Sequence, residues 1–277
     1  MTIDKIADKL KKNEIAYDMN YLQAILNEES NAEQEIVALL LLFWVEKKHK
    51  RKLYKEIKAI IERMFDNLEE DMSMEFAARH QEGYTEGTFL AQLVMGSFSK
   101  ILKPTSYNPN WHINKGNFID DLRFYKNRLI NEITIETERM IALEAPVDEA
   151  IYTLKKPFKK LQNSTKAMVD TEMVYAERQG LKDAYTDNGV EQYRYIATLD
   201  NLTCDKCGEL DGKVFDLNKA VVGANYPPMH TYCRCVVIPV FDDFDTSERY
   251  AKDENGETIE VVMTYDEWKK KYGKPKK

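Results

Sequence analysis

The chain has 277 residues and a formal net charge of −7, from 40 Lys and Arg against 47 Asp and Glu. This length allows one or two soluble domains with a real core, and 43% hydrophobic residues exclude disorder of the whole chain. The acidic balance disfavours a bulk nucleic-acid binder, so any DNA contact would come from local basic patches such as 47–58 or the Lys-rich C-terminus.

The longest apolar run, Ile36 to Val45, has ten residues. A membrane-spanning helix needs about 20, so we expect a buried helix face and no membrane span. Glu33 and Glu35 precede this run and basic residues follow it. A signal peptide would show the opposite charge order, so secretion by that route is not expected.

Apolar residues at helical spacing dominate from Met1 to about Asn188. The most regular stripe starts after Pro146, and we expect its helix to end at the cap-forming run Asn163-Ser164-Thr165. A further helix is predicted from Thr165 to Gln179, with Gly180 as its left-handed C-terminal cap. The three clearest stripes are Leu53, Ile57, Ile60, Ile61 and Met64; Phe118, Leu122, Tyr125, Leu129 and Ile133; and Val147, Ile151, Leu154, Phe158 and Leu161.

The pattern changes after Gly189. Alternation over 193–198 and the run 236–238 predict strands, and Asn255-Gly256 before 258–262 predicts a hairpin. A closing helix with Trp268 is expected over 264–272. With a loop expected at 103–117, the chain divides into a helical N-terminal region (1–110), a second helical part (111–190), a β-rich Cys/His module (191–245) and a hairpin and helix tail (246–277). The predicted fold class is α+β.

All four cysteines, Cys204, Cys207, Cys233 and Cys235, lie in this C-terminal part, and His230 lies among them. In a Cys-x-x-Cys turn two thiolates face one ion, and Gly208 permits the tight backbone that such a knuckle needs. We therefore expect a structural zinc site. The all-thiolate set and a set in which His230 replaces one cysteine both stay open, as do buried thiols without metal or two reducible disulfides.

Enzymatic patterns are poor matches. His80-Gln81-Glu82 resembles half of a zinc deaminase signature, but more than a hundred residues separate it from Cys204, so we interpret His80 and Glu82 as solvated helix residues. No phosphate-binding glycine motif is present. The turn at Asp211-Gly212 is interpreted as structural, with local hydrogen bonding by Asp211 and a positive φ at Gly212.

Several motifs follow one another between Asp170 and Val240. They are Asp170-Thr171-Glu172 with Tyr175, Ala197-Thr198-Leu199-Asp200, Thr203-Cys204-Asp205-Lys206-Cys207, Leu210-Asp211-Gly212-Lys213-Val214-Phe215, Pro227-Pro228-Met229-His230 and Cys233-Arg234-Cys235. Together they resemble the Mu F-like minor head proteins of tailed bacteriophages. The helical pattern from about Phe118 to Gln179 resembles the helices before this module in the family. Asp170 stands where members usually have Arg, and Thr231-Tyr232 where they usually have Pro-Asn.

The resemblance implies a phage head morphogenesis protein, not an enzyme, that associates with the portal vertex and assists DNA packaging or delivery. It implies the portal protein as partner, with the major capsid or scaffold protein as further candidates. The location would be the virion, in the head interior near the portal, after assembly in the host cytoplasm. Alternatives are a nuclease or transferase in residues 1–110 and a DNA-binding accessory factor that uses Lys47–Lys58 and Lys269–Lys277.

Partner binding is expected on the helical part, because residues 1–110 carry amphipathic helix and no visible chemistry. Helix-in-groove docking near Phe43 and Trp44, beside the basic stretch 47–58, is the predicted mode. A shortened chain that begins near residue 110 is then expected to stay folded and to lose the portal.

Overall fold

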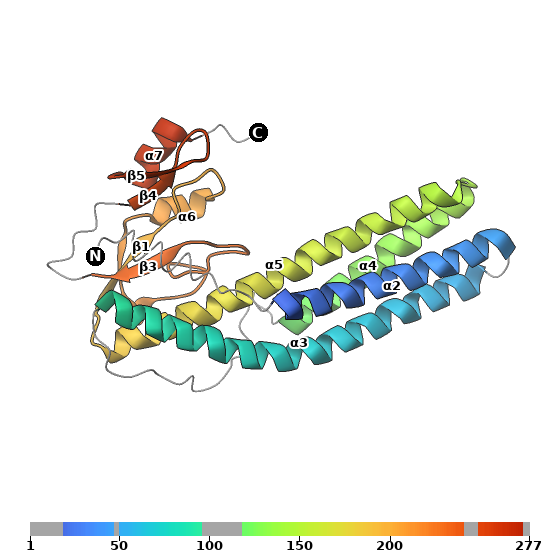
Figure 1. Cartoon of the computed structure of the whole chain (residues 1–277), viewed down its shortest axis with the longest axis horizontal. Helices are drawn as coiled ribbons and strands as arrows, with labels where there is room; N and C mark the ends of the chain where they lie inside the picture. Colours follow the sequence, from blue (N-terminus) through green and yellow to red (C-terminus); the bar gives the residue numbers. More distant parts are fainter. Residues whose placement is uncertain (1–18, 47–49, 96–117, 241–248, 274–277) are drawn as a thin grey trace. The chain divides into compact units, whose positions relative to one another are not determined.

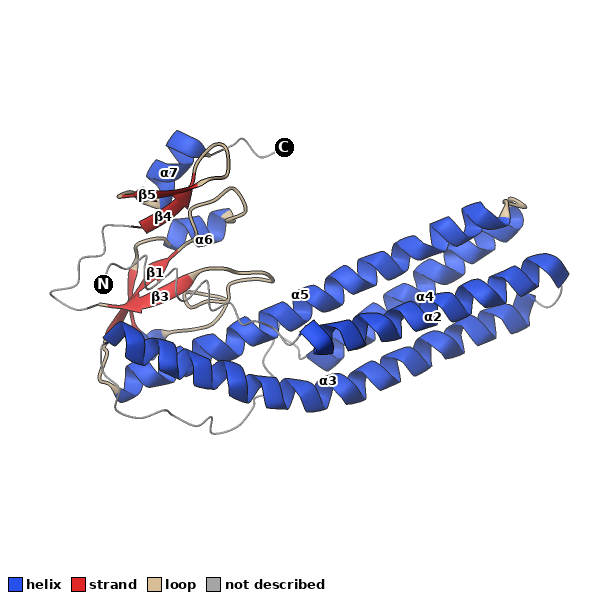
Figure 2. Ribbon diagram, viewed as in Figure 1, coloured by secondary structure: helices blue, strands red, loops and turns tan. Residues whose placement is uncertain are grey.

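The computed structural model describes residues 19–46, 50–95, 118–240 and 249–273 (Figure 1). Its elements are α2 (Met19–Glu46), α3 (Lys50–Met95), α4 (Phe118–Ala142), α5 (Val147–Asp187), β1 (Gln192–Ile196), α6 (Asp205–Leu210), β2 (Val214–Asp216), the 3₁₀ turn η1 (Leu217–Lys219), β3 (Val236–Pro239), β4 (Arg249–Lys252), β5 (Thr258–Val261) and α7 (Tyr265–Tyr272). Helices dominate, and the described strands all follow residue 191 (Figure 2). This confirms the predicted α+β class. No described helix is long and apolar enough to cross a membrane.

The chain forms two compact units. Of the described residues, 78–95, 170–240 and 249–273 form one, here named the mixed unit, and 19–46, 50–77 and 118–169 form the other, here named the helical unit. The borders fall inside α3 and α5, so each of these helices contributes to both units. The predicted division at 110, 190 and 245 stays a prediction, and the predicted loop at 103–117 lies outside the described residues.

The helical unit contains α2, the first part of α3, α4 and the first part of α5 (Figure 1). Ile57, Leu129 and Leu154, one from each predicted stripe, are at most 3% exposed, so the apolar stripes do form the interior. At the surface, Arg63 of α3 pairs with Glu35 of α2, and their closest atoms lie 2.6 Å apart.

Two predicted helix ends are wrong, because α5 continues without a break from 147 to 187. The hydroxyls of the expected cap residues have other partners. Ser164 donates to the Lys160 carbonyl (3.0 Å), and Thr165 donates to the carboxylate of Glu29 (2.7 Å). These hydroxyls therefore do not compete with the helix for its own amides.

Gly180 is an interior residue of α5 and not its C-terminal cap. In the mixed unit, a Cβ at Gly180 would overlap the backbone carbonyl of Tyr84 in α3. A Cβ at Gly87 would likewise overlap the carbonyl of Glu177. The glycines therefore permit a close backbone crossing of the two helices, a tertiary requirement that a local cap pattern does not reveal.

The mixed unit contains an antiparallel sheet in the order β2-β1-β3. This confirms the predicted strand at 236–238 and the one that begins near 193, which ends at Ile196 and not at 198. Tyr195 pairs with Val237, and Tyr193 pairs with Phe215. One apolar core joins this sheet to the final turns of α3 and to α5, and it contains the buried Cys207, Cys233 and Cys235. The sheet thus places the cysteines in the best packed part of the unit.

The tail confirms the predicted hairpin and closing helix. β4 and β5 pair around a turn in which Gly256 has φ +87°. Thr264 and Glu267 form a reciprocal capping box at the start of α7. The indole N–H of the buried Trp268 donates to the carbonyl of Lys252 (2.7 Å), so the helix is fixed to the hairpin.

Asp211 connects this tail to the sheet. Its carboxylate accepts from the backbone N–H of Ala197 and of Tyr265, both at 2.8 Å, and pairs with the buried guanidinium of Arg249 (2.8 Å). The expected local role of Asp211 is therefore wrong, because its partners lie 14 to 54 residues away. Gly212 has φ +74°, which confirms the predicted left-handed turn.

Candidate metal centre

The first pair of cysteines lies at the start of α6. Cys204 is the N-cap residue, and its sulfur accepts the backbone N–H of Cys207 at 3.4 Å. The thiolate is the form of cysteine that binds metals. Gly208 has a different role from the one expected, since a Cβ there would overlap the ring of Tyr265.

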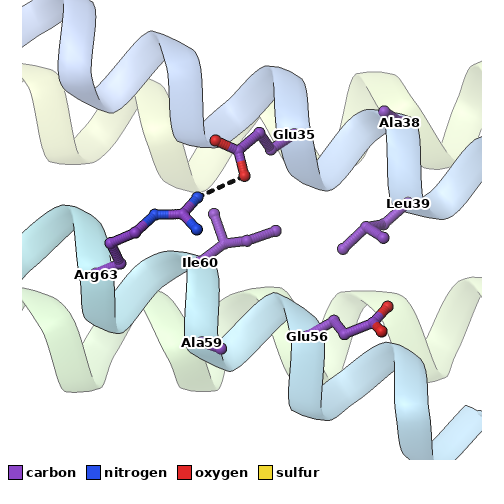
Figure 3. A pocket seen from close by; sticks show the side chains of 7 residues that line it. All are labelled: Glu35, Ala38, Leu39, Glu56, Ala59, Ile60 and Arg63. Carbon is purple, nitrogen blue, oxygen red and sulfur yellow. Dashed lines mark hydrogen bonds and ion pairs between the residues drawn. The ribbon is translucent and has the colours of Figure 1, made fainter.

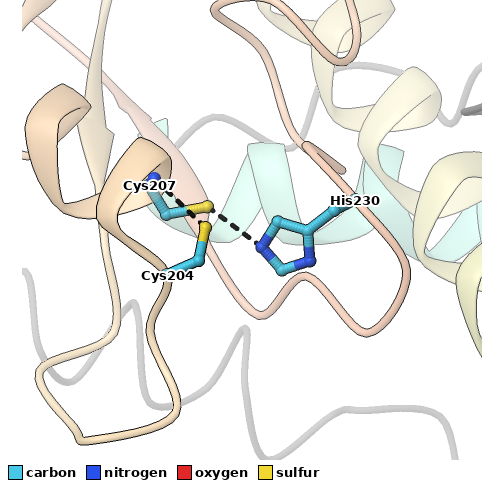
Figure 4. Close-up of side chains that lie close together, drawn as sticks. All are labelled: Cys204, Cys207 and His230. Atoms are coloured by element: carbon cyan, nitrogen blue, oxygen red, sulfur yellow. Dashed lines mark hydrogen bonds between the residues drawn. The ribbon is translucent and has the colours of Figure 1, made fainter. Parts of the chain in front are cut away.

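His230 reaches this pair from the loop before β3 (Figure 4). Its Nε2 lies 3.3 Å from the Cys207 sulfur, and its Nδ1 lies 2.7 Å from the carbonyl oxygen of Thr231. Because a carbonyl only accepts, Nδ1 carries the proton and Nε2 presents its lone pair to the sulfur side. This tautomer is the one that an Nε2 metal ligand requires.

The five predicted ligands form two overlapping groups. The ligand atoms of Cys204, Cys207 and His230 all lie within 4.8 Å of one another, and so do those of Cys207, Cys233 and Cys235. Cys207 belongs to both groups. All four cysteines are free thiols in the structure. Among the described residues these are the groups of His, Cys, Asp and Glu that could hold a metal ion.

Burial and mutual hydrogen bonds shift the pKa values of the buried thiols in opposite directions. Hydrogen bonding to Cys233 and burial raise the pKa of Cys207, whereas hydrogen bonds from Cys207 and Cys235 lower the pKa of Cys233 far below the usual range for a thiol. Of these three thiols, Cys233 is therefore the one that ionises most readily. A cation at their centre would allow the neighbouring thiols to ionise as well.

Polar contacts fix the two loops that carry the ligands. Arg234 forms a two-point salt bridge with Asp200, in which Nη2 of Arg234 lies 2.9 Å from Oδ1 of Asp200. The hydroxyl of Thr198 donates to the backbone carbonyl of Arg234 (3.1 Å). The N–H of Tyr232 donates to the hydroxyl of Thr171 in α5 (3.3 Å). Sequence reasoning assigned these residues no role at the site, although all five lie in the motifs singled out there or next to them.

The donor set fits a metal ion that prefers sulfur and nitrogen ligands. In a tetrahedral zinc site with Zn–S near 2.3 Å, ligand atoms lie about 3.5–3.8 Å apart. Within each group of three the ligand atoms lie at most 4.8 Å apart, so they would have to move closer together around an ion. The cluster can hold a metal.

The deaminase-like arrangement does not form within the described residues. His80 is buried, 7% exposed, and its ring centroid lies 6.0 Å from that of Tyr175, so its interpretation as a solvated residue is wrong. Glu82 is exposed, as predicted. Within the part of the chain that the structure describes, neither residue belongs to a group that could hold a metal. Helical spacing alone did not show that His80 faces α5.

Comparison with known proteins gives one family. A family model described as phage Mu protein F like protein matches residues 140–238, which extend from the end of α4 to β3 and include all five candidate ligands. No curated protein and no solved structure gives a match. The match covers the motif-bearing region that the sequence alone related to these proteins. Over residues 140–238 the chain is therefore similar to the phage Mu protein F-like family.

Proposed function

We propose that the chain is a head morphogenesis protein of a tailed phage that associates with the portal protein and assists DNA packaging or delivery. The observation that carries this proposal is the family match at residues 140–238. In this role the protein joins the phage head during assembly in the host cytoplasm. In the finished virion it lies in the head interior near the portal. It acts by binding and not by catalysis.

We further propose that the Cys/His cluster is a structural zinc site with Cys204, Cys207, His230 and Cys233 as ligands. His230 presents Nε2 toward Cys207, and the N–H of Cys233 donates to the carbonyl of His230 (3.1 Å), so one turn presents both residues. When bound, zinc would stabilise the fold by cross-linking α6 to the loop before β3. Cys235, 3% exposed, then remains a buried core thiol.

A groove on the helical unit suits the portal contact. Between α2 and α3, Ala38, Leu39, Ala59 and Ile60 line a hollow of about 460 Å³ (Figure 3). Three charged residues, Glu35, Glu56 and Arg63, complete its lining. An apolar floor with a charged rim is the usual receptor for an amphipathic helix.

The apolar run 36–45 supports this docking. Ile36 and Leu40 are buried in the helical unit, whereas Ala38 and Leu41 on the same helix are exposed. The run therefore carries more apolar surface than the core of this unit covers. Phe43 is half-buried, and the side chain of Trp44 lies outside the described residues.

Co-purification with the portal protein of the same genome tests the proposal. The variants Ala38→Glu and Ala59→Glu place bulk and charge in the groove at exposed positions, so the fold should tolerate them, and each should lower portal capture at least tenfold. Ala24→Glu, at another exposed position of α2, is the matched control and should bind like the wild type. Absence of capture of the wild-type chain would overturn the portal proposal, and equal capture of all variants would exclude this groove.

A further inference from the structure

One stretch of α5 has a local excess of positive charge, although the chain as a whole is acidic. Between Ile151 and Val169 the sequence has five lysines and no acidic residue. The lysines stand at 155, 156, 159, 160 and 166, and all are exposed. The whole stretch lies in the helical unit, apart from the Cys/His cluster. This local excess of positive charge indicates an interaction with an anion.

Neighbouring helices neutralise two of the five lysines. Lys155 pairs with Glu33 of α2 (3.6 Å), and Lys160 pairs with Glu132 of α4 (3.3 Å). These pairs mark the two sides of the outward face of α5. The other three lysines lie between them and form no ion pair within the described part of the chain.

The central positions form one straight line. Residues 152, 156, 159, 163 and 166 repeat at steps of four, three, four and three, so they share one helix face. We name Tyr152, Lys156, Lys159, Asn163 and Lys166 the α5 stripe; all five are exposed. At a rise of 1.5 Å per residue the stripe is about 21 Å long. The Lys156 ammonium also lies 4.9 Å from the centre of the Tyr152 ring.

A linear polyanion matches this stripe better than a compact anion does. Duplex DNA has a rise of about 3.4 Å per base pair, so 21 Å corresponds to about six base pairs. Arg128 of α4 donates to Ser164 (3.5 Å), next to the stripe, and adds a further cation. No residue of the stripe presents a carboxylate that would repel phosphates. The tyrosine hydroxyl and the asparagine amide can also donate to phosphate oxygens.

We propose that the α5 stripe binds the phosphate backbone of double-stranded DNA without sequence preference. This inference deepens the proposed role in packaging or delivery and rests on that role for the choice of DNA as the polyanion. The site differs from the basic segments 47–58 and 269–277, which the sequence alone suggested. Binding through three lysines would be weak and strongly dependent on salt.

Fluorescence anisotropy with the full-length chain and a labelled 20-base-pair duplex tests the surface. The variant Lys156→Gln/Lys159→Gln should bind at least fivefold more weakly at 50 mM salt, and its salt slope should fall by about 2, because each lost phosphate contact removes about 0.9. Lys155→Gln/Lys160→Gln removes the same charge from the same helix at ion-paired positions. This matched control should keep the slope. Circular dichroism melting should show both variants folded, because Gln forms helix as well as Lys.

Three results would overturn the inference. The first is that the wild-type chain does not bind DNA at 50 mM salt. The second is that the two double variants lose DNA affinity equally. The third is that only Lys50→Gln/Arg51→Gln lowers DNA affinity. Polyglutamate of matched charge serves as a further competitor. If it displaces the labelled duplex at concentrations at which unlabelled duplex does not, that result would assign the stripe to an acidic protein and not to DNA. Portal capture is measured separately, so DNA binding without portal binding would contradict only the proposed portal association.

Discussion

Gly87 of α3 lies so close to Glu177 of α5 that a methyl group at position 87 would overlap the Glu177 carbonyl oxygen. In an isolated helix Gly→Ala is favourable by about 1 kcal/mol. Here the two backbones would have to separate, so we expect Gly87→Ala to lower the free energy of unfolding by about 1–3 kcal/mol. Urea unfolding measures this change.

Gly83→Ala is the control for that crossing. A Cβ at Gly83 would meet the Cβ of Ala176 at 3.2 Å, a tight contact that a small shift relieves. Its cost should therefore be clearly smaller than that of Gly87→Ala. A Gly87→Ala protein as stable as the wild type would show that the helices are not held at this distance.

Glu29 makes the stability of the helical unit dependent on pH. The residue is fully buried, and burial raises its pKa to about 7, partly offset by the hydrogen bond from Thr165. Above pH 4.5 the unfolded chain loses this proton more readily than the folded chain does. Stability should therefore fall as the pH rises from about 4.5 to 7, by roughly 3 kcal/mol in total, and then level off.

The variant Glu29→Gln isolates this effect, because it keeps an oxygen that accepts from Thr165 and cannot ionise. Urea unfolding at pH 5 and pH 8 should show a smaller loss of stability in the variant than in the wild type. Identical pH dependence in the two proteins would mean that the carboxyl group is ionised in the folded state.

Metal analysis tests the proposed ligands. The purified chain should hold about one equivalent of zinc, and a chelator should preferentially unfold the mixed unit. Cys204→Ser, Cys207→Ser and His230→Ala should each lose the metal. Cys235→Ser should retain it, since this thiol is proposed as a core residue. Zinc retained by His230→Ala and lost by Cys235→Ser would instead support the all-thiolate set, and a metal-free wild type with an unchanged melting curve would exclude a site.

Asp211 should be essential to the attachment of the tail. Asp211→Ala leaves the guanidinium of Arg249, 7% exposed, without its carboxylate and frees the amide of Tyr265. A loss of about 3–5 kcal/mol is expected for breaking such a buried pair. Asp205→Ala, which breaks the exposed pair with Lys269, should cost less than about 1 kcal/mol. Thermal unfolding compares the two, and similar values would mean that other contacts hold the tail.

The expectation of a stable fragment from residue 110 onward needs correction. Residues 78–95 of α3 belong to the mixed unit, and Leu90, Ala91 and Val94 are buried in its core. A chain without them would expose the sheet and α5 to water. Loss of portal binding by that fragment would therefore report unfolding, which is why the groove is tested with single substitutions.

Local signals predicted the local features well. The Asn255-Gly256 turn, the strands around Tyr195 and Val237 and the helix with Trp268 all follow from residues that are neighbours in the sequence. The Cys-x-x-Cys turn and the clustering of His230 with Cys233 and Cys235 likewise indicated the candidate ligands.

Features that depend on distant partners could not be predicted in this way. The hydroxyl of Thr165 is a cap donor by type, but the carboxylate of Glu29 is its partner in the fold. Gly180 looks like a helix terminus until Tyr84 is placed against it. No periodicity reveals that Asp211 accepts from three separate segments, since each partner is selected by tertiary packing.

The position of Cys207 in both donor groups has a consequence for chemical reactivity. Cys207 is a ligand both in the all-thiolate set and in the set that contains His230. Alkylation or oxidation of its sulfur would therefore remove a ligand in either case. Its sulfur is protected by burial, whereas Cys204 is only half-buried. A thiol reagent should therefore label Cys204 first, and labelling of Cys207 should report opening of the module.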